Sequence, residues 1–243
     1  MSWAAHDLEP YVFQRHLGRG VRISFIAFVI GSWGPDLVTK WFVYGVDFGG
    51  INLEAGDPVQ FHRGWPGAGL THSPAFAIAF GLVVYALTKS RAWAIGLTLG
   101  IIAHLLSDIG DTIGVMFFFP FSTMQVTAGA WAYAGQHGRL VDAAAYYSGL
   151  SFVWNALWIA LGFACYPILK REYFHKRIAP VDGFWAWAGR FLPEDGLLAL
   201  YRGALFYGTC RFIAWMLWAH VLHHYPIDLS WGGPYWVQAA HPS

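Results

Sequence analysis

Long apolar runs dominate the sequence, at about residues 20–45, 74–88, 92–119, 144–169 and 204–224. Each run is long enough, or nearly so, to cross a bilayer as a helix of roughly 20 residues. Hydrophobic residues make up 56% of the chain and charged residues 12%, about half the charged share of a soluble domain. The sequence therefore predicts an all-α polytopic membrane protein, a bundle of about five transmembrane helices with interfacial segments.

We expect residues 1–243 to form a single membrane domain, because a chain of 243 residues holds about five or six spans with short loops. The half at 1–125 carries the motifs described below. The half at 126–243 would add further spans, a cytoplasmic interfacial segment near 180–200 and an outer carboxyl tail. The net charge of +1 argues against nucleic acid as a partner.

Basic residues are unevenly shared between the two sides of such a bundle. With five crossings, most of them fall on the side of the polar segment 1–22, the 89–91 turn and the segment 170–203. The opposite side holds only Lys40, Arg63 and Arg139 in its loops. The positive-inside rule then predicts a cytoplasmic amino terminus and an outer carboxyl terminus. Most histidines fall on the outer side, so a site built from them would face outward.

Two aromatic stretches are typical of membrane-surface structure. The segment 184–192 contains Phe184, Trp185, Trp187 and Phe191 and predicts an interfacial segment on the cytoplasmic side. Trp231, Tyr235 and Trp236 predict an aromatic belt outside. In the first apolar run, Gly34-Pro35 predicts that the helix breaks or reaches the far surface near Gly34.

The third apolar run carries polar residues with a spacing that suits a cation. His104 and Asp108 are one helical turn apart and share a face, and Asp111 continues the stripe. A carboxylate inside a span costs at least a few kcal/mol unless it is paired or bound to a metal. The alternatives are an Asp–His hydrogen bond between two helices, or an Asp108 at the headgroup level in contact with water.

Further polar residues fall on the same outer side. Asp36 follows Gly34-Pro35 and is typical of a turn or a helix cap. His72 lies between two hydroxyl residues that could cap the second span, which leaves His72 available as a ligand. Arg63, after His62, would suit a phosphate or a carboxylate. A surface salt bridge is the alternative for Arg63, with Glu54 or Asp57.

The order of these motifs resembles the family of predicted LexA-regulated inner-membrane metal-dependent hydrolases. The resemblance covers about residues 15 to 125 and rests on Pro35-Asp36, His62-Arg63-Gly64, Thr71-His72-Ser73, His104-x3-Asp108-x3-Thr112-x-Gly114-Val115 and Pro120-Phe121. It implies a multi-span protein of the bacterial inner membrane with a divalent metal held by His and Asp. Its candidate ligands here are Asp36, His62, His72, His104 and Asp108, with Arg63 and Thr71 in support.

The sequence departs from the family pattern in two places. Residues 65–70 are inserted between His-Arg-Gly and Thr-His-Ser, which could move His62 and Arg63 away from the metal. Val38 and Thr39 stand where a second acid is common. These departures leave open a former enzyme kept as a structural or assembly subunit of a larger membrane complex.

A working site would use a divalent metal, zinc before manganese or iron, to supply hydroxide at neutral pH. Arg63 would hold an anionic group of the substrate, and Asp111 or a histidine that does not bind the metal would act as general base or acid. The location at the outer membrane face favours a phosphoester or a lipid-like substrate. His220-x-x-His223-His224 matches one box of a di-iron enzyme, but such enzymes need several boxes, so we expect a hydrated cluster or an extra ligand for the same metal.

Overall fold

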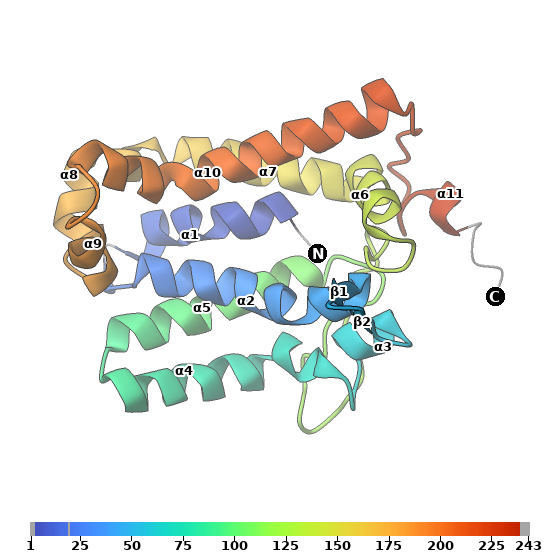
Figure 1. Cartoon of the computed structure of the whole chain (residues 1–243), viewed down its shortest axis with the longest axis horizontal. Helices are drawn as coiled ribbons and strands as arrows, with labels where there is room; N and C mark the ends of the chain where they lie inside the picture. Colours follow the sequence, from blue (N-terminus) through green and yellow to red (C-terminus); the bar gives the residue numbers. More distant parts are fainter. Residues whose placement is uncertain (1–2, 19, 239–243) are drawn as a thin grey trace.

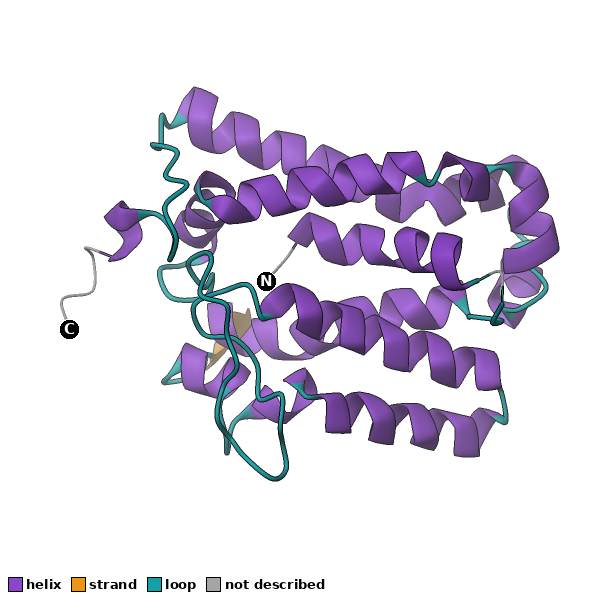
Figure 2. Ribbon diagram, turned by 180° about the vertical axis from the view of Figure 1, so that it is seen from behind, coloured by secondary structure: helices purple, strands orange, loops and turns teal. Residues whose placement is uncertain are grey.

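The computed structural model describes residues 3–18 and 20–238. Its long helices lie roughly parallel and run alternately from one end of the bundle to the other (Figures 1 and 2). These helices are α1 (Trp3–Leu17), α2 (Phe25–Tyr44), α4 (Pro74–Thr88), α5 (Arg91–Asp108), α7 (Leu150–Ala164) and α10 (Glu194–Met216), the last continued by the π-helical turn η4 (Leu217–Leu222). The predicted all-α architecture is confirmed in its coarse form, since helices make up most of the described chain.

Short elements cover the two ends of the bundle. The site end is the end that carries β1 (Val46–Phe48), β2 (Ile51–Leu53), α3 (Pro58–Arg63), the 3-10 turn η1 (Ala68–His72), α6 (Arg139–Ser148) and α11 (Tyr235–Gln238). β1 and β2 form an antiparallel hairpin in which Val46 pairs with Leu53. The basic end is the opposite one, with η2 (Tyr166–Leu169), α8 (Arg171–Tyr173), η3 (Phe174–Ile178) and α9 (Gly183–Ala188) (Figure 1).

Helix α1 lies inside the bundle, in contact with α2, α5, α7 and α10. Its first turn is capped by Asn155 of α7, whose Oδ1 accepts hydrogen bonds from the backbone nitrogens of Ala4 (2.8 Å) and Ala5 (3.2 Å). The helix therefore begins at the site end and ends, with Arg15 in its last turn, at the basic end (Figure 1); the cytoplasmic placement of the amino terminus stays a prediction.

Helices α2 and α5 pack closely through glycines. A Cβ on Gly100 would lie 2.3 Å from the Phe28 carbonyl oxygen, and one on Gly31 would lie 2.4 Å from the Leu97 carbonyl oxygen. Helix α2 continues through Gly34 to Tyr44, so the predicted break near Gly34 does not occur, while the alternative that the chain reaches the far surface there stays a prediction. Pro35 lies inside the helix, and Thr39 donates a hydrogen bond to the Pro35 carbonyl.

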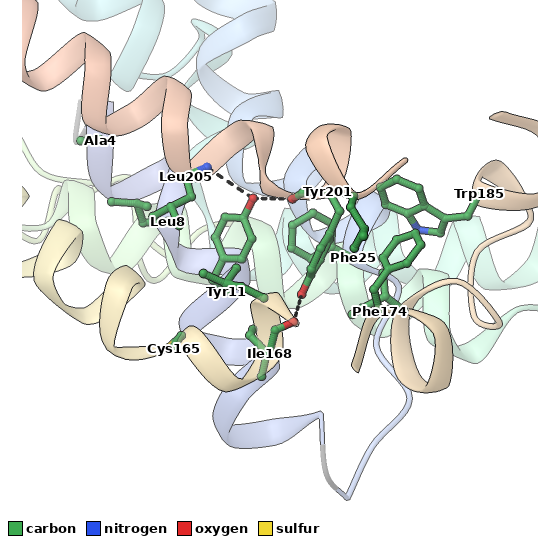
Figure 3. Close-up of a cluster of buried hydrophobic side chains, with 13 residues drawn as sticks. Ala4, Leu8, Tyr11, Phe25, Cys165, Ile168, Phe174, Trp185, Tyr201 and Leu205 are labelled. Atoms are coloured by element: carbon green, nitrogen blue, oxygen red, sulfur yellow. Dashed lines mark hydrogen bonds between the residues drawn. The ribbon is translucent and has the colours of Figure 1, made fainter. Parts of the chain in front are cut away.

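The largest aromatic cluster of the core lies towards the basic end (Figure 3). Tyr11 donates to the Tyr201 carbonyl (2.5 Å), and Tyr201 donates to the Ile168 carbonyl (3.1 Å). Trp185 is buried against Phe174. Trp185 is therefore a core residue, and its predicted interfacial position is wrong. Trp187 and Phe191 of the same segment are exposed, as an interfacial segment requires.

Exposed apolar side chains lie along the outer faces of α4, α7 and α10, as expected for contact with lipid. By length and hydropathy, one described helix qualifies as a membrane span, Glu194–Leu222, and a second qualifies if α6 and α7 count as one span bent by 76°. The bend lies at Gly149, inside the expected run 144–169. The finer prediction of about five spans stays a prediction.

Candidate metal centre

Four of the five candidate ligands converge at the site end. Asp36 comes from α2, His72 from the end of η1, and His104 and Asp108 from the last turns of α5. One ligand atom from each lies within 4.8 Å of the others. The fifth candidate, His62 at the end of α3, has its Nε2 atom 3.2 Å from Asp36 Oδ1. The three histidines and Asp108 are fully buried, while the Asp36 side chain is 17% exposed.

The tautomer of His104 follows from its surroundings. Its Nδ1 atom lies 2.7 Å from the backbone carbonyl oxygen of Ser32, which can only accept. The imidazole proton of the neutral ring is therefore on Nδ1, and the lone pair of Nε2 points into the cluster, where Asp108 Oδ2 lies 3.0 Å away. Such a second-sphere bond is typical of a metal-ligating histidine.

Two threonines give the same tautomer to the other histidines. Thr39 Oγ1 donates its hydrogen to the Pro35 carbonyl and thus accepts from His62 Nδ1 at 2.6 Å. Thr71 Oγ1 donates to the Ala68 carbonyl and accepts from His72 Nδ1 at 3.1 Å. Burial, followed by the charge of Arg63, lowers the pKa of His72 to about 3, so this ring is neutral at physiological pH.

The cluster consequently brings acceptors together without protons between them. The Nε2 atoms of His62, His72 and His104 and Asp36 Oδ1 are buried and make no hydrogen bond of good geometry within the described chain. Neutral imidazole lone pairs and carboxylate oxygens repel one another at these distances, and a buried acceptor without a partner costs about 1–3 kcal/mol. A cation would satisfy all of them at once.

The spacing of the atoms also fits a metal. The shortest separations between imidazole Nε2 atoms and carboxylate oxygens in the cluster run from 3.0 to 4.0 Å. Tetrahedral ligands with bonds of about 2.1 Å lie about 3.4 Å apart. Nitrogen and carboxylate donors in a tetrahedral set are the ligands that zinc prefers.

The inserted residues 65–70 do not carry His62 away from the cluster. They fold back so that η1 begins after Gly67, and the rings of His62 and His72 meet with centroids 4.6 Å apart. The other departure from the family pattern has a role as well, because Thr39 is the residue that orients His62. Neither departure removes a candidate ligand from the site.

Arg63 is fully buried, and its guanidinium forms ion pairs with Asp108 (2.5 Å) and Asp111 (3.4 Å). The surface salt bridge with Glu54 or Asp57 is therefore wrong; Asp57 instead caps α3 by accepting from the Gln60 nitrogen. The use of Arg63 as a direct ligand for a substrate anion also loses support, because its charge is matched inside the protein. Its position favours holding the Asp108 carboxylate ionised and oriented.

Asp111 has a structural role in place of the predicted general base. One of its carboxylate oxygens accepts from the backbone nitrogens of Ile113 (2.9 Å) and Gly114 (2.7 Å), and the other faces Arg63. Gly114 needs to be glycine here, since its φ is +75° and a Cβ would meet the Val126 carbonyl. With its oxygens engaged, Asp111 fixes the turn after α5.

Sequence reasoning missed one histidine of the site, His6 of α1. Its ring stacks on His104 with centroids 4.0 Å apart, and its Nε2 lies 3.7 Å from Asp108 Oδ1. Behind it, the buried Glu9 lies 3.3 Å from His6 Nδ1 and accepts from Ser32 and Ser107. The spacing of His6 and Glu9, three residues apart in the 3–17 segment, was the available signal, but it is equally typical of a solvated helix.

The histidines after α10 do not join the cluster. Both ring nitrogens of His220 lie near backbone carbonyls, Nδ1 at 2.9 Å from Tyr225 and Nε2 at 3.1 Å from Tyr147. His223 and His224 are exposed. The prediction that this group adds a ligand for the same metal is therefore wrong.

A comparison with protein families identifies the family of the chain. The sequence profile of the YdjM inner membrane protein family matches residues 8–174. The chain belongs to the YdjM inner membrane protein family. All five candidate ligands lie within the matched part, whereas His6 lies outside it. No curated protein and no solved structure matches this YdjM-family protein.

Proposed function

We propose that this protein is a metal-dependent hydrolase of the bacterial inner membrane that acts on a phosphoester or lipid-like substrate at the outer face. The observation that carries the proposal is the convergence of the Nε2 atoms of three histidines, each with its Nδ1 held by an oxygen acceptor, on the carboxylates of Asp36 and Asp108. Five protein donors of this kind leave a cation as the natural occupant.

Zinc is the metal we propose, with manganese or iron as alternatives, because imidazole and carboxylate donors suit all three. When bound, such a cation would lower the pKa of water so that hydroxide, the nucleophile for an ester, is available at neutral pH. His104 and Asp108 would hold it from α5, with Asp36 and His72 completing the set and His62 beside Asp36. Arg63 fixes the Asp108 carboxylate, and the backbone carbonyl of Ser32 fixes the His104 ring.

The outer location rests on charge. Lys89, Arg91, Lys170, Lys176 and Arg190 lie in or beside the connections of the basic end, opposite the cluster (Figure 1). Basic loops face the cytoplasm, so the site end would face outward at the level of the lipid headgroups. The amphiphilic substrate follows from this location.

Elemental analysis of detergent-purified protein tests the proposal. The wild type would contain near-stoichiometric metal, and His104→Ala and Asp36→Asn would lose it. His220→Ala is the matched control. This half-buried histidine lies against the backbone carbonyls of Tyr225 and Tyr147 and outside the cluster, so the variant would keep the metal. Thermal unfolding of each variant separates loss of metal from loss of fold.

The second function is a structural or assembly subunit on a hydrolase-like scaffold. A wild type without metal, even after reconstitution with zinc, manganese and iron, would overturn the hydrolase and favour this role. Stoichiometric co-purification of another membrane protein would then identify its complex. A metal-loaded protein that cleaves phosphoester lipids would exclude it.

A further inference from the structure

A cavity of about 490 Å³ lies beside the metal cluster, lined by residues of α1, α2, α10 and the start of α6. Asp36 belongs to both, since its Oδ1 faces the histidines while the residue lines the cavity. Asp36 is also the member of the four-residue cluster whose side chain retains exposure, at 17%. The cavity is thus the route by which a ligand would reach the cluster.

Three basic residues, Lys40, Arg139 and Arg211, line the cavity together with two acidic residues, Asp7 and Asp36, so its wall carries an excess of positive charge. Lys40 lies one helical turn after Asp36, and Arg139 and Arg211 lie across from it on α6 and α10. Arg211 is matched by Asp7, whose Oδ2 lies 2.6 Å from its Nη2 atom. Arg139 makes no ion pair with any residue that the structure describes. An anion is the ligand that such a wall favours.

Lys40 is positioned to donate into the cavity. Its Nζ donates to the Ala134 carbonyl at 3.2 Å and lies 5.2 Å from the centre of the Tyr133 ring. An ammonium group has three donors, so donors remain for the oxygens of a ligand. Because Asp36 and Lys40 share one face of α2, the bound anion would lie next to the metal cluster.

The remaining wall is apolar and opens sideways. Trp33 of α2 and Tyr207 of α10 bridge the two helices with ring centroids 6.4 Å apart. Leu37, Trp41 and Tyr207 line the cavity and are each about half exposed, at 51%, 57% and 53%. These residues lie on the flank of the bundle, where a membrane protein contacts lipid.

We propose that this cavity binds the phosphate headgroup of an anionic lipid beside the cluster, with the hydrocarbon chains leaving the bundle between α2 and α10. The inference rests on the proposed function for its catalytic meaning, because it names the substrate class of the same site. The chemistry that is recognised is a phosphate ester. A lipid and a soluble phosphate share that chemistry, and the apolar opening favours the lipid.

Binding measured without turnover tests the inference. Metal-free protein in detergent would be titrated with a diacyl phosphate monoester lipid, with phosphatidylcholine and with inorganic phosphate, and bound lipid would be counted by native mass spectrometry. We expect the anionic lipid to bind at least ten-fold more tightly than phosphatidylcholine. Inorganic phosphate would not displace it at equal concentration.

Arg139→Gln and Lys40→Gln would each weaken binding of the anionic lipid about ten-fold. Arg190→Gln at the basic end, outside the cavity, is the matched control and would bind as the wild type does. Equal binding of the two lipids, displacement by inorganic phosphate, or full binding by both cavity variants would overturn the inference. Arg139→Gln should keep its metal, so failure of lipid binding with metal present is distinct from failure of the hydrolase proposal.

Discussion

Arg63 and Asp108 form an ion pair with both side chains fully buried, and the Nη2 to Oδ2 distance is 2.5 Å. The pair joins α3, a short helix of the site end, to the last turn of α5. A buried charge is costly without its partner, so the pair ties the position of α3, which carries His62, to the position of the cluster. Stability of the site end and geometry of the site are therefore coupled.

Replacement of Arg63 by Gln would destabilise the metal-free protein by about 3–5 kcal/mol, because it leaves the Asp108 carboxylate buried without a matching charge. Thermal and denaturant unfolding in detergent would measure the loss. Lys176→Gln is the control, since Lys176 pairs with Glu172 on an exposed surface and its loss should leave stability nearly unchanged. Equal effects of the two variants would contradict the buried pair.

Removal of the Thr39 hydroxyl should lower the affinity for metal although every candidate ligand remains in place. Thr39→Val removes the acceptor of His62 Nδ1 while keeping the shape of the side chain, and should weaken zinc binding about 10–100-fold. Competition with a chelator of known affinity would measure it. Thr39→Ser keeps the hydroxyl and should bind normally.

Thr209→Val is the matched control for Thr39→Val. Thr209 of α10 donates to the carbonyl four residues before it, as Thr39 does, but it touches no cluster residue. A similar fall in zinc affinity in this variant would show that the effect comes from the helix and not from His62.

The i, i+4 spacing of His104 and Asp108 was enough to predict that they share a helix face, and the motif order was enough to select Asp36 and His72. What the sequence could not supply is the partner of each polar group. Arg63 next to His62 reads as a free cation, and only the fold shows Asp108 and Asp111 beside it. The contacts of Arg63 and Asp111 inside the protein were therefore not predicted, even though both residues lie at the site.

Helix α1 illustrates the same limit for the fold. Its buried Asp7 and Glu9 would be costly in an apolar environment, and hydropathy accordingly places them in water. Their partners Arg211, Ser32 and Ser107 are 23 to 204 residues away in the sequence. Long-range pairing of this kind is invisible to any local pattern, so an inner helix was read as a polar terminal segment.

Gly100→Ala tests the close contact between α2 and α5 and should destabilise the protein. Its Cβ would meet the Phe28 carbonyl, a rigid backbone atom, at 2.3 Å, and overpacking of this kind costs about 1–3 kcal/mol. Gly203→Ala is the matched control in α10, where a Cβ meets nothing within 4 Å. This control should be neutral or stabilising by up to about 1 kcal/mol. Thermal unfolding would compare them, and an unchanged Gly100→Ala would contradict the helix contact.

Asp182, in the loop before α9, caps a helix distant in sequence. Its Oδ2 accepts from the backbone nitrogens of Phe25 (3.1 Å) and Ile26 (3.5 Å) at the start of α2. Burial raises the pKa of the Asp182 carboxyl above its ordinary value. The ionised form of Asp182 is therefore less favoured in the folded protein than in the unfolded chain. The stability that the protonated carboxyl group contributes is fully present below its pKa in the unfolded chain, and it is lost as the pH rises through the higher pKa of the folded protein.

Asp182→Asn keeps an acceptor oxygen but carries no charge, so its stability relative to the wild type should increase as the pH rises from about 3 to about 7. Asp182→Ala removes the acceptor and should lose about 1 kcal/mol. Unfolding in detergent at several pH values would measure both. If Asp182→Asn instead lost stability relative to the wild type as the pH rose, the charge of the carboxylate would be stabilising α2, and the burial of Asp182 would not dominate its ionisation.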